Sequence, residues 1–374
     1  MEGVGDGCNL ARRQDESLVQ DDGWIRRKPG VSDASMQTAI WVGMAATAIC
    51  VASAVRGEAA WRTRADQPPR KVVVASAQLR FAGSVDERLE LIRSGLAEAA
   101  RKAAEQGKRL DVVVFPEFAL QREGSSAAEQ ALGLEESWVK QLKDFVREHG
   151  AWTVVPMTLR EDHGRCSNAA VLFNRTGEVA GVFRKVHPML DPDGRFEAGV
   201  TPGDAYPVFE CDFGKLGILI CWDMSYSEAW AKLAEAGAEI VALPSASPQT
   251  LRPAAEALRH HYHVVTSTQR DNASLFDPIG RTIAQVTEPG MLVHEIDLSY
   301  AILHWSPTLH EGRALKERYA EKVGGTYSPR EDTGVFWSND PAVSIGQMVR
   351  ELGLREMPEV VAEVKAARAE MAGQ

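Results

Sequence analysis

The stretch Gly214-Lys-Leu-Gly-Ile-Leu-Ile-Cys-Trp-Asp223 places a cysteine at the end of an apolar run. Leu216 to Ile220 is short, apolar and bounded by turn-forming and polar residues, which predicts a buried β-strand. Cys221 therefore follows the carboxyl end of a strand, where α/β sheets place their chemistry. Because cysteine is also a small apolar residue that prefers interiors, this stretch alone leaves a structural role and a catalytic role open.

Composition sets the class of the protein. The chain has 374 residues, 44% of them hydrophobic and 25% charged, with a formal net charge of −10. These fractions are typical of a globular protein, and the length allows one large domain with additions or two domains. The negative charge disfavours nucleic acid and anionic membrane surfaces as partners, because both select basic faces.

Neither a disulfide framework nor a metal site is predicted. The five cysteines stand at positions 8, 50, 166, 211 and 221, with no Cys-x-x-Cys pair. His260-His-Tyr-His263 could suggest metal ligands, because His260 and His263 would share a face of a predicted helix. No carboxylate-rich segment accompanies them, so an ordinary helix surface is favoured and no metal is expected.

The first 70 residues are interpreted as a leader. Thr38 to Val55 is an uncharged stretch of about 18 residues, near the lower limit for a membrane span, with basic residues upstream and small residues after it. This order is typical of a secretory signal or a single membrane anchor. The protein would then be exported or anchored, and otherwise cytoplasmic. Residues 62–70 are expected to be a linker.

From Lys71 onward, strands alternate with helices. An Asn174-Arg-Thr-Gly177 turn predicts a hairpin, so the sheet is mixed and the fold class is α/β. Strands are predicted at 72–77, 111–116, 152–157, 169–173, 179–183, 208–210, 216–220, 239–243, 264–268 and 291–296, and helices at 84–107, 135–149, 227–236 and 254–263.

Three polar residues follow predicted strands. Glu117 comes after a buried run, Lys185 after the second hairpin strand and Cys221 after its own strand. Singly, Glu117 fits the start of a helix and Lys185 fits a solvated edge. Together they supply a base, a cation and a nucleophile, which are the groups that amide hydrolysis by a thiol requires.

These segments resemble the nitrilase superfamily of carbon–nitrogen hydrolases. The resemblance is carried by Phe115-Pro-Glu117, Phe183-Arg-Lys-Val-His-Pro188 and Leu216-Gly-Ile-Leu-Ile-Cys-Trp-Asp223, with further matches at 200–204, 206–209, 236–240 and 277–280. It covers residues 71–298, which are taken as the hydrolase domain. It implies a four-layer α-β-β-α sandwich, a Glu-Lys-Cys triad and no metal or organic cofactor.

The resemblance also assigns roles to residues. It implies Cys221 as nucleophile, Glu117 as general base and Lys185 as a cation for the oxyanion. The Trp222 backbone amide is a second oxyanion donor. A second glutamate is expected at Glu197, for which Asp191 and Asp193 compete. His187 is a candidate pocket residue, although a lone histidine near a turn is more often structural.

The substrate class follows from the residues after the cysteine. Trp222-Asp223 resembles the amidase and carbamoyl-amidase branches more than the nitrile-cleaving one, so Asp223 belongs to the expected substrate site. A small amide or carbamoyl compound, cleaved through a thioester on Cys221, is therefore expected. A nitrilase, an N-acyltransferase and an idle binding scaffold remain as alternatives. The segments 165–170 and 245–248 are expected to be pocket loops.

The last 76 residues, 299–374, form an extension. It is rich in aromatic and charged residues, and helices are predicted at 342–352 and 358–372. Such additions in this family wrap a neighbouring subunit or cover the site, so a homo-oligomer is expected. The alternative is an extension that folds back on its own domain.

Overall fold

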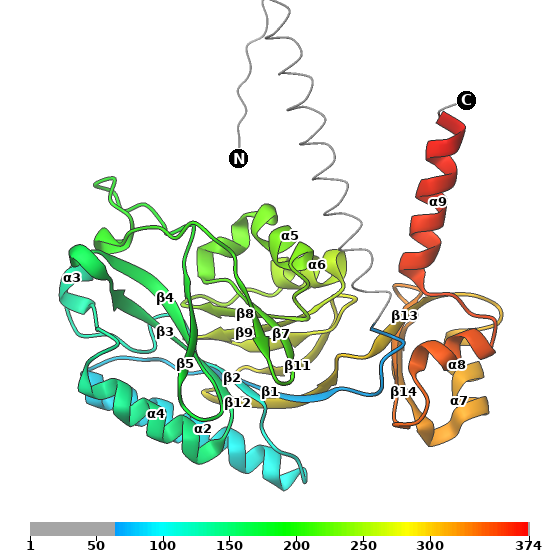
Figure 1. Cartoon of the computed structure of the whole chain (residues 1–374), viewed down its shortest axis with the longest axis horizontal. Helices are drawn as coiled ribbons and strands as arrows, with labels where there is room; N and C mark the ends of the chain where they lie inside the picture. The colour runs from blue at the N-terminus through cyan, green and yellow to red at the C-terminus, as the bar shows by residue number, and fades with distance from the viewer. Residues whose placement is uncertain (1–63, 373–374) are drawn as a thin grey trace, which may run out of the picture. The chain divides into compact units, whose positions relative to one another are not determined.

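Two mixed β-sheets form the centre of the computed structural model, which describes residues 64–372, all within one compact unit (Figure 1). In the first sheet the order is β5-β4-β3-β2-β1-β12. Strands β1, β2 and β3 are parallel, while β4 and β12 run antiparallel to their neighbours. The bounds are β1 Lys71–Gln78, β2 Val112–Val114, β3 Trp152–Arg160, β4 Cys166–Phe173, β5 Val179–Arg184 and β12 Gly290–Asp297.

The second sheet has the order β6-β7-β8-β9-β10-β11, with β7, β8 and β9 parallel. It pairs with the first sheet only where Gln78, at the end of β1, meets Thr268, at the end of β9. Elsewhere the two sheets face each other. The bounds are β6 Val208–Cys211, β7 Gly214–Ile218, β8 Ile240–Ser245, β9 His263–Thr268, β10 Ala273–Phe276 and β11 Thr282–Val286.

Alternation along β1 creates the layers. Val72 and Val74 belong to the core between the two sheets, whereas Val73 and Ala75 belong to the core beneath the helices. Because successive side chains point to opposite faces, a strand with two buried faces is apolar throughout. The unbroken apolar run at 72–75 is thus the sequence signature of an internal layer.

Helices cover the outer face of each sheet (Figure 1). Helices α2 and α4 pack on the first sheet, and α5 and α6 pack on the second. Ser84 and Glu87 cap the start of α2 reciprocally, which explains why the helix begins where the sequence predicts. The bounds are α2 Val85–Glu105, α3 Ala127–Gln130, α4 Ser137–His149, α5 Ser227–Glu235 and α6 Leu251–His260. The predicted four-layer α-β-β-α sandwich is confirmed.

The C-terminal extension is ordered and contains strands that the sequence did not predict. Strands β13, β15 and β14 form a separate antiparallel sheet with its own apolar core. Gly324 and Gly325 of β14 pair with Trp337 and Phe336, whose rings lie so close over them that a Cβ atom would collide. Adjacent glycines argue against a strand in sequence, and here they make room for the rings. The bounds are β13 Tyr300–His304, β14 Val323–Ser328, β15 Thr333–Ser338, α7 Arg313–Tyr319, α8 Ile345–Glu351 and α9 Met357–Ala372.

This extension packs on its own hydrolase domain. Arg281 donates to Thr326 of β14, and Lys71 donates to Asn339 after β15 over 3.3 Å. Within the part of the chain that the structure describes, the extension contacts its own domain, and its role as an oligomer contact or a cover of the site stays a prediction.

Residues 64–70, predicted as a linker, contact the fold closely. The Arg64 guanidinium donates to the Tyr300 hydroxyl at 2.8 Å and to the carbonyls of His261 and Ala238 at 2.9 and 3.0 Å. Arg70 pairs with Glu239. These contacts join the segment before β1 to β8, β9 and β13 at the amino ends of the parallel strands.

The apolar stretch Thr38 to Val55 lies outside the described residues. Among residues 64–372, no helix is both long enough and apolar enough to cross a bilayer.

Arg64→Ala should destabilise the fold. The substitution leaves a buried hydroxyl and two carbonyls without their charged donor, which is expected to cost about 3 kcal/mol of unfolding free energy. Urea unfolding followed by fluorescence measures this change. Arg101→Ala is the matched control: Arg101 makes an ion pair within α2 while its side chain is 59% exposed, so a change within about 0.5 kcal/mol is expected. Equal stability losses in the two variants would contradict the role given to Arg64.

Candidate active site

The predicted triad residues follow strands whose carboxyl ends lie at one edge. Glu117 comes after β2, Lys185 directly after β5 and Cys221 at the start of a short 3-10 turn, Cys221–Ser225, after β7. Strand β5 is antiparallel to β4, which is antiparallel to β3, so β5 runs in the direction of β2. The topology therefore brings residues separated by up to 104 positions to the same edge.

Lys185 lies between two carboxylates. Its ammonium donates to Glu117 Oε1 at 2.8 Å and to an oxygen of Glu197. The side chains of Lys185 and Glu117 are each only 2% exposed. Burial by itself lowers the pKa of Lys185, but the charges of Glu117, Cys221 and Glu197 outweigh it and raise the pKa above its usual value. Lys185 is therefore a permanently charged group inside the site.

Asn168 of β4 links the same two carboxylates from the other side. Its Nδ2 donates to Glu117 Oε1 at 2.8 Å and to Glu197 Oε2 at 2.9 Å. Backbone amides complete the cluster, because Ala246 N–H donates to Glu117 and Met189 N–H donates to Glu197, both at 3.0 Å. Every one of these partners is a donor, so each carboxylate accepts hydrogen bonds from both the lysine and its surroundings.

Cys221 adjoins this cluster and has a left-handed backbone, with φ of 46°. A positive φ is unusual for a residue with a side chain, and such strained backbone is common at functional sites. Burial is the largest influence on the thiol, followed by the Glu117 charge, and together they raise the pKa of Cys221 to about 12 although Lys185 lowers it. Desolvation therefore outweighs the effect of the neighbouring lysine on the thiol.

Asp223 shapes the turn that carries Cys221. This buried carboxylate accepts from Ile220 N–H at 3.1 Å and from His187 N–H at 2.7 Å, tying β7 to the segment after Lys185. Burial raises the pKa of Asp223 to about 6. The His187 ring stacks on Tyr226, with ring centroids 3.5 Å apart. His187 and Asp223 thus support the site, whereas the Trp222 side chain is 40% exposed beside it.

Glu197, and neither aspartate, reaches the lysine. Glu197 begins the 3-10 turn Glu197–Gly199 and has a positive φ of 32°. Asp191 accepts from Ala198 N–H at 2.7 Å and so holds that turn, while Asp193 pairs with Arg195 at the surface. Of the three acidic residues, the path of this loop brings only Glu197 into contact with Lys185.

Several residues near the triad were missed by sequence reasoning. Asn168 was missed because the segment 165–170, expected as a pocket loop, is mostly the buried strand β4. Gln269, whose side chain donates to the Glu117 carbonyl at 2.7 Å, was also missed. The segment 245–248 was expected near the pocket, and there the Ser245 hydroxyl lies close enough to Cys221 to lower the pKa of the thiol, against the larger effect of burial. A buried polar residue in an apolar strand was the available signal for Asn168.

The prediction that His260 and His263 share one face of a helix is wrong. Helix α6 ends at His260, His261 adopts a left-handed backbone with φ of 53°, and His263 begins β9. The two side chains therefore belong to different elements. Across residues 64–372, no group of three or more His, Cys, Asp or Glu residues is arranged to hold a metal ion.

Fold and site together define a carbon–nitrogen hydrolase. The model of the carbon-nitrogen hydrolase family matches residues 73–303, more than half of the chain, and the protein belongs to this family. The resemblance to the nitrilase superfamily is confirmed, and the protein is an amidase-like member.

Relatives with assigned names include amidases and a citrullinase. The omega-amidase of Xenopus tropicalis is 28% identical over 209 residues, covering 50% of this chain and 71% of that protein. The citrullinase of Francisella tularensis is 29% identical over 185 residues, covering 47% and 61%. The deaminated glutathione amidase of Mus musculus is 30% identical over 164 residues, covering 37% and 51%.

Two solved structures share the fold. A carbon-nitrogen hydrolase from Helicobacter pylori G27 superposes with a TM-score of 0.53 at 20% identity, covering 61% of this chain and 90% of that one. A Saccharomyces cerevisiae protein from branch 10 of the nitrilase superfamily has a TM-score of 0.52 at 20% identity, covering 62% and 90%.

Asn168→Asp should make stability depend on pH. A third carboxyl beside Glu117 and Glu197 would be protonated in the folded state well above its usual range, so stability is retained at low pH and lost as pH rises. We expect a loss of about 3 kcal/mol at pH 8 relative to pH 5, compared with the parent chain. Urea unfolding at each pH measures this. Asn174→Asp is the control, because the Asn174 side chain only accepts hydrogen bonds in its turn. A pH-independent difference would contradict the arrangement.

Glu117→Gln should make Cys221 easier to alkylate at pH 8. Removal of the Glu117 charge lowers the pKa of the thiol while Lys185 remains, so the thiolate fraction rises. We expect alkylation by iodoacetamide to accelerate several-fold, as measured by peptide mass spectrometry over time. Cys211 on β6 is the internal control, and its rate should not change. Slower alkylation of Cys221 in this variant would show that Glu117 activates the thiol more than it suppresses it.

Proposed function

We propose that this protein hydrolyses a non-peptide carbon–nitrogen bond in a small amide or carbamoyl compound through a thioester on Cys221. The observation that carries the proposal is the Lys185 ammonium held between Glu117 and Glu197 beside the Cys221 thiol. A nucleophile, a base and a fixed cation within one buried cluster are what acyl transfer by a thiol needs.

The first step is attack by the thiol. Because its pKa is raised to about 12, Cys221 is protonated at neutral pH and needs a base as it attacks. Glu117 adjoins the thiol and takes the proton while the sulfur bonds to the carbonyl carbon. The electron pair of the C=O bond moves to oxygen and forms a tetrahedral oxyanion.

Lys185 stabilises that oxyanion. Two of its three N–H bonds point to Glu117 and Glu197, which leaves one for the substrate oxygen. The Trp222 N–H, in the first turn of a 3-10 helix, has no acceptor within that helix and is the second donor. A donor of this kind typically lowers the barrier by about 2.7 to 4 kcal/mol.

Collapse of the oxyanion breaks the carbon–nitrogen bond. Glu117 returns its proton to the departing nitrogen, ammonia or an amine leaves, and the acyl group remains on the sulfur. Water then attacks the thioester with Glu117 accepting its proton. The C–S bond breaks, the sulfur regains a proton, and the product is a carboxylic acid, or a carbamic acid from a carbamoyl substrate.

Glu197 and Asp223 hold the reacting groups in place. Glu197 accepts from Lys185 and fixes the direction of its ammonium, and Asp223 fixes the turn that presents Cys221. Neither needs to exchange a proton with the substrate. The named activities of the relatives, on amides and on citrulline, support the amide and carbamoyl classes over nitriles.

Cys221→Ala should abolish turnover on every substrate that the parent chain accepts. A panel of small amides, carbamoyl compounds and nitriles, assayed for ammonia release, identifies the class, and mass spectrometry of the quenched parent enzyme should show an acyl adduct on Cys221. Cys211→Ala is the matched control and should retain full activity, because Cys211 lies on β6 away from the cluster.

Two outcomes would contradict this mechanism. Turnover that survives Cys221→Ala, or an adduct on another cysteine, would exclude Cys221 as nucleophile. Faster turnover of nitriles than of amides would leave the thioester in place but replace the amidase by the nitrilase alternative.

A further inference from the structure

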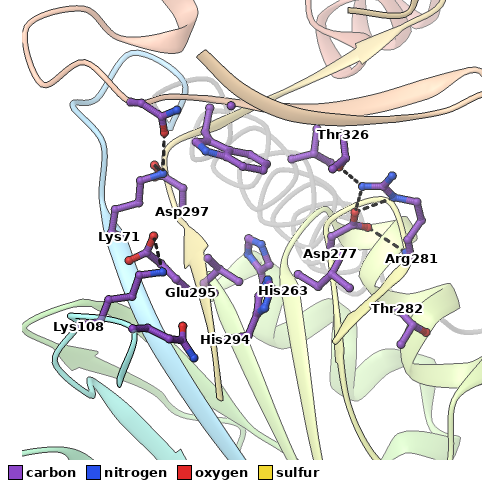
Figure 2. Close-up of a pocket in the computed structure, with 17 residues that line it drawn as sticks. Lys71, Lys108, His263, Asp277, Arg281, Thr282, His294, Glu295, Asp297 and Thr326 are labelled. Carbon is purple, nitrogen blue, oxygen red and sulfur yellow. Dashed lines mark hydrogen bonds and ion pairs between the residues drawn. The ribbon is translucent and has the colours of Figure 1, made fainter. Parts of the chain in front are cut away.

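A cavity of about 740 Å³ lies between the hydrolase domain and the C-terminal sheet (Figure 2). Its walls include Lys71 and His263, the first residues of β1 and β9, whereas the catalytic cluster follows the carboxyl ends of the parallel strands. Strands β14 and β15 of the C-terminal sheet close its other side, through residues such as Thr326 and Trp337. None of the residues assigned to catalysis lines this cavity.

The charges in the cavity wall balance. Lys71 pairs with Asp297 at 3.1 Å, Lys108 with Glu295 at 3.4 Å, and Arg281 with Asp277 at 2.6 Å. Three cations and three carboxylates therefore neutralise one another within the wall. A charged ligand would lose its hydration in the cavity and find no unpaired counter-charge in the wall. Its transfer from water would therefore cost free energy. The wall thus favours an uncharged ligand.

Two imidazoles are among the polar groups of the wall. His263 is only 4% exposed, and its Nδ1 has no hydrogen-bond partner among the described residues. His294 of β12 lies beside it (Figure 2). Burial lowers the pKa of both rings, so both are neutral, and a neutral imidazole offers one donor and one acceptor. The Nδ1 of His263 is therefore available to a polar group of a ligand.

The remaining walls are apolar and restrict the shape of a ligand. Ile296 of β12 and Ile283 of β11 line the cavity, together with Val335 and the Trp337 indole of β15. The cavity continues the gap between two facing sheets, which are typically about 10 Å apart from backbone to backbone. Such a gap accepts a flat ring more readily than a bulky group. The volume is within the range of small-molecule sites.

We propose that this cavity binds an uncharged, planar heteroaromatic molecule. Its ring lies between the apolar walls and the Trp337 indole, and its polar edge hydrogen-bonds His263 and His294. The site is separate from the hydrolytic cluster and does not depend on the proposed reaction.

Benzimidazole is a suitable probe, because it is planar, uncharged at pH 7.5, and carries one donor and one acceptor nitrogen. Calorimetry with the full chain should give 1:1 binding with a sub-millimolar Kd. Indene lacks the nitrogens, benzoate is an anion and benzamidine is a cation, and each should bind at least tenfold more weakly.

Two variants locate the site. His263→Phe keeps the ring against Tyr300 but removes both nitrogens, and should weaken benzimidazole binding at least tenfold. Ile283→Trp fills the cavity from a half-buried position on β11 and should abolish binding without touching the histidines. Thermal unfolding and the rate of Cys221 alkylation check that each variant is folded. Prior alkylation of Cys221 should leave benzimidazole binding unchanged.

The proposal is overturned by any of four results. These are no binding of benzimidazole to the parent chain, binding that survives both folded variants, equal binding of the charged analogues, and binding that is lost when Cys221 is alkylated. The last result would move the ligand to the hydrolytic cluster.

Discussion

The rest of the site depends on one buried cation held by two carboxylates. The Lys185 ammonium, Glu117 and Glu197 come from three segments, and each charge is tolerated in the interior only because the others are present. Asn168 and two backbone amides supply further donors, so the oxygens of both carboxylates have hydrogen-bond partners. Removing one partner from such a cluster leaves an uncompensated charge. Because Glu197 lies on the loop after β5, the path of that loop determines whether the charge of Lys185 is compensated.

The same burial sets the character of the thiol. Cys221 is buried beside the Glu117 charge and keeps its proton. Its attack on a substrate carbonyl therefore depends on a base in contact with the thiol. Asp223 adds a geometric constraint, because it ties the turn after β7 to the segment after Lys185. Cys221, Lys185 and Glu117 are therefore positioned by hydrogen bonds between loops, and the left-handed backbone at Cys221 is maintained by these surroundings.

The two ends of the sandwich have different roles. The cluster of Lys185, Glu117, Glu197 and Cys221 follows the carboxyl ends of the strands, and the contacts with the C-terminal sheet lie at the amino ends. Arg64, buried against Tyr300, and Arg281, paired with Asp277 and Thr326, join that sheet to the hydrolase domain. The extension thus packs away from Cys221 in the described part of the chain. The cavity with His263 and His294 lies where the two sheets and the added sheet meet.

The residues alone were enough to indicate the α/β class and the triad, because a polar residue directly after a buried strand is a local pattern. Glu117, Lys185 and Cys221 each have it. No local pattern shows whether the three residues meet. Their meeting depends on the sheet order, in which the antiparallel β4 lets β5 run in the same direction as β2. Asn168 could be noticed in sequence as a polar residue within an apolar strand, but that pattern reveals neither its partners nor its face. Similarly, Gly324 and Gly325 form a strand only because Trp337 and Phe336 cover them. Patterns within one element can be read from the chain, whereas contacts between elements exist only once packing fixes which faces meet.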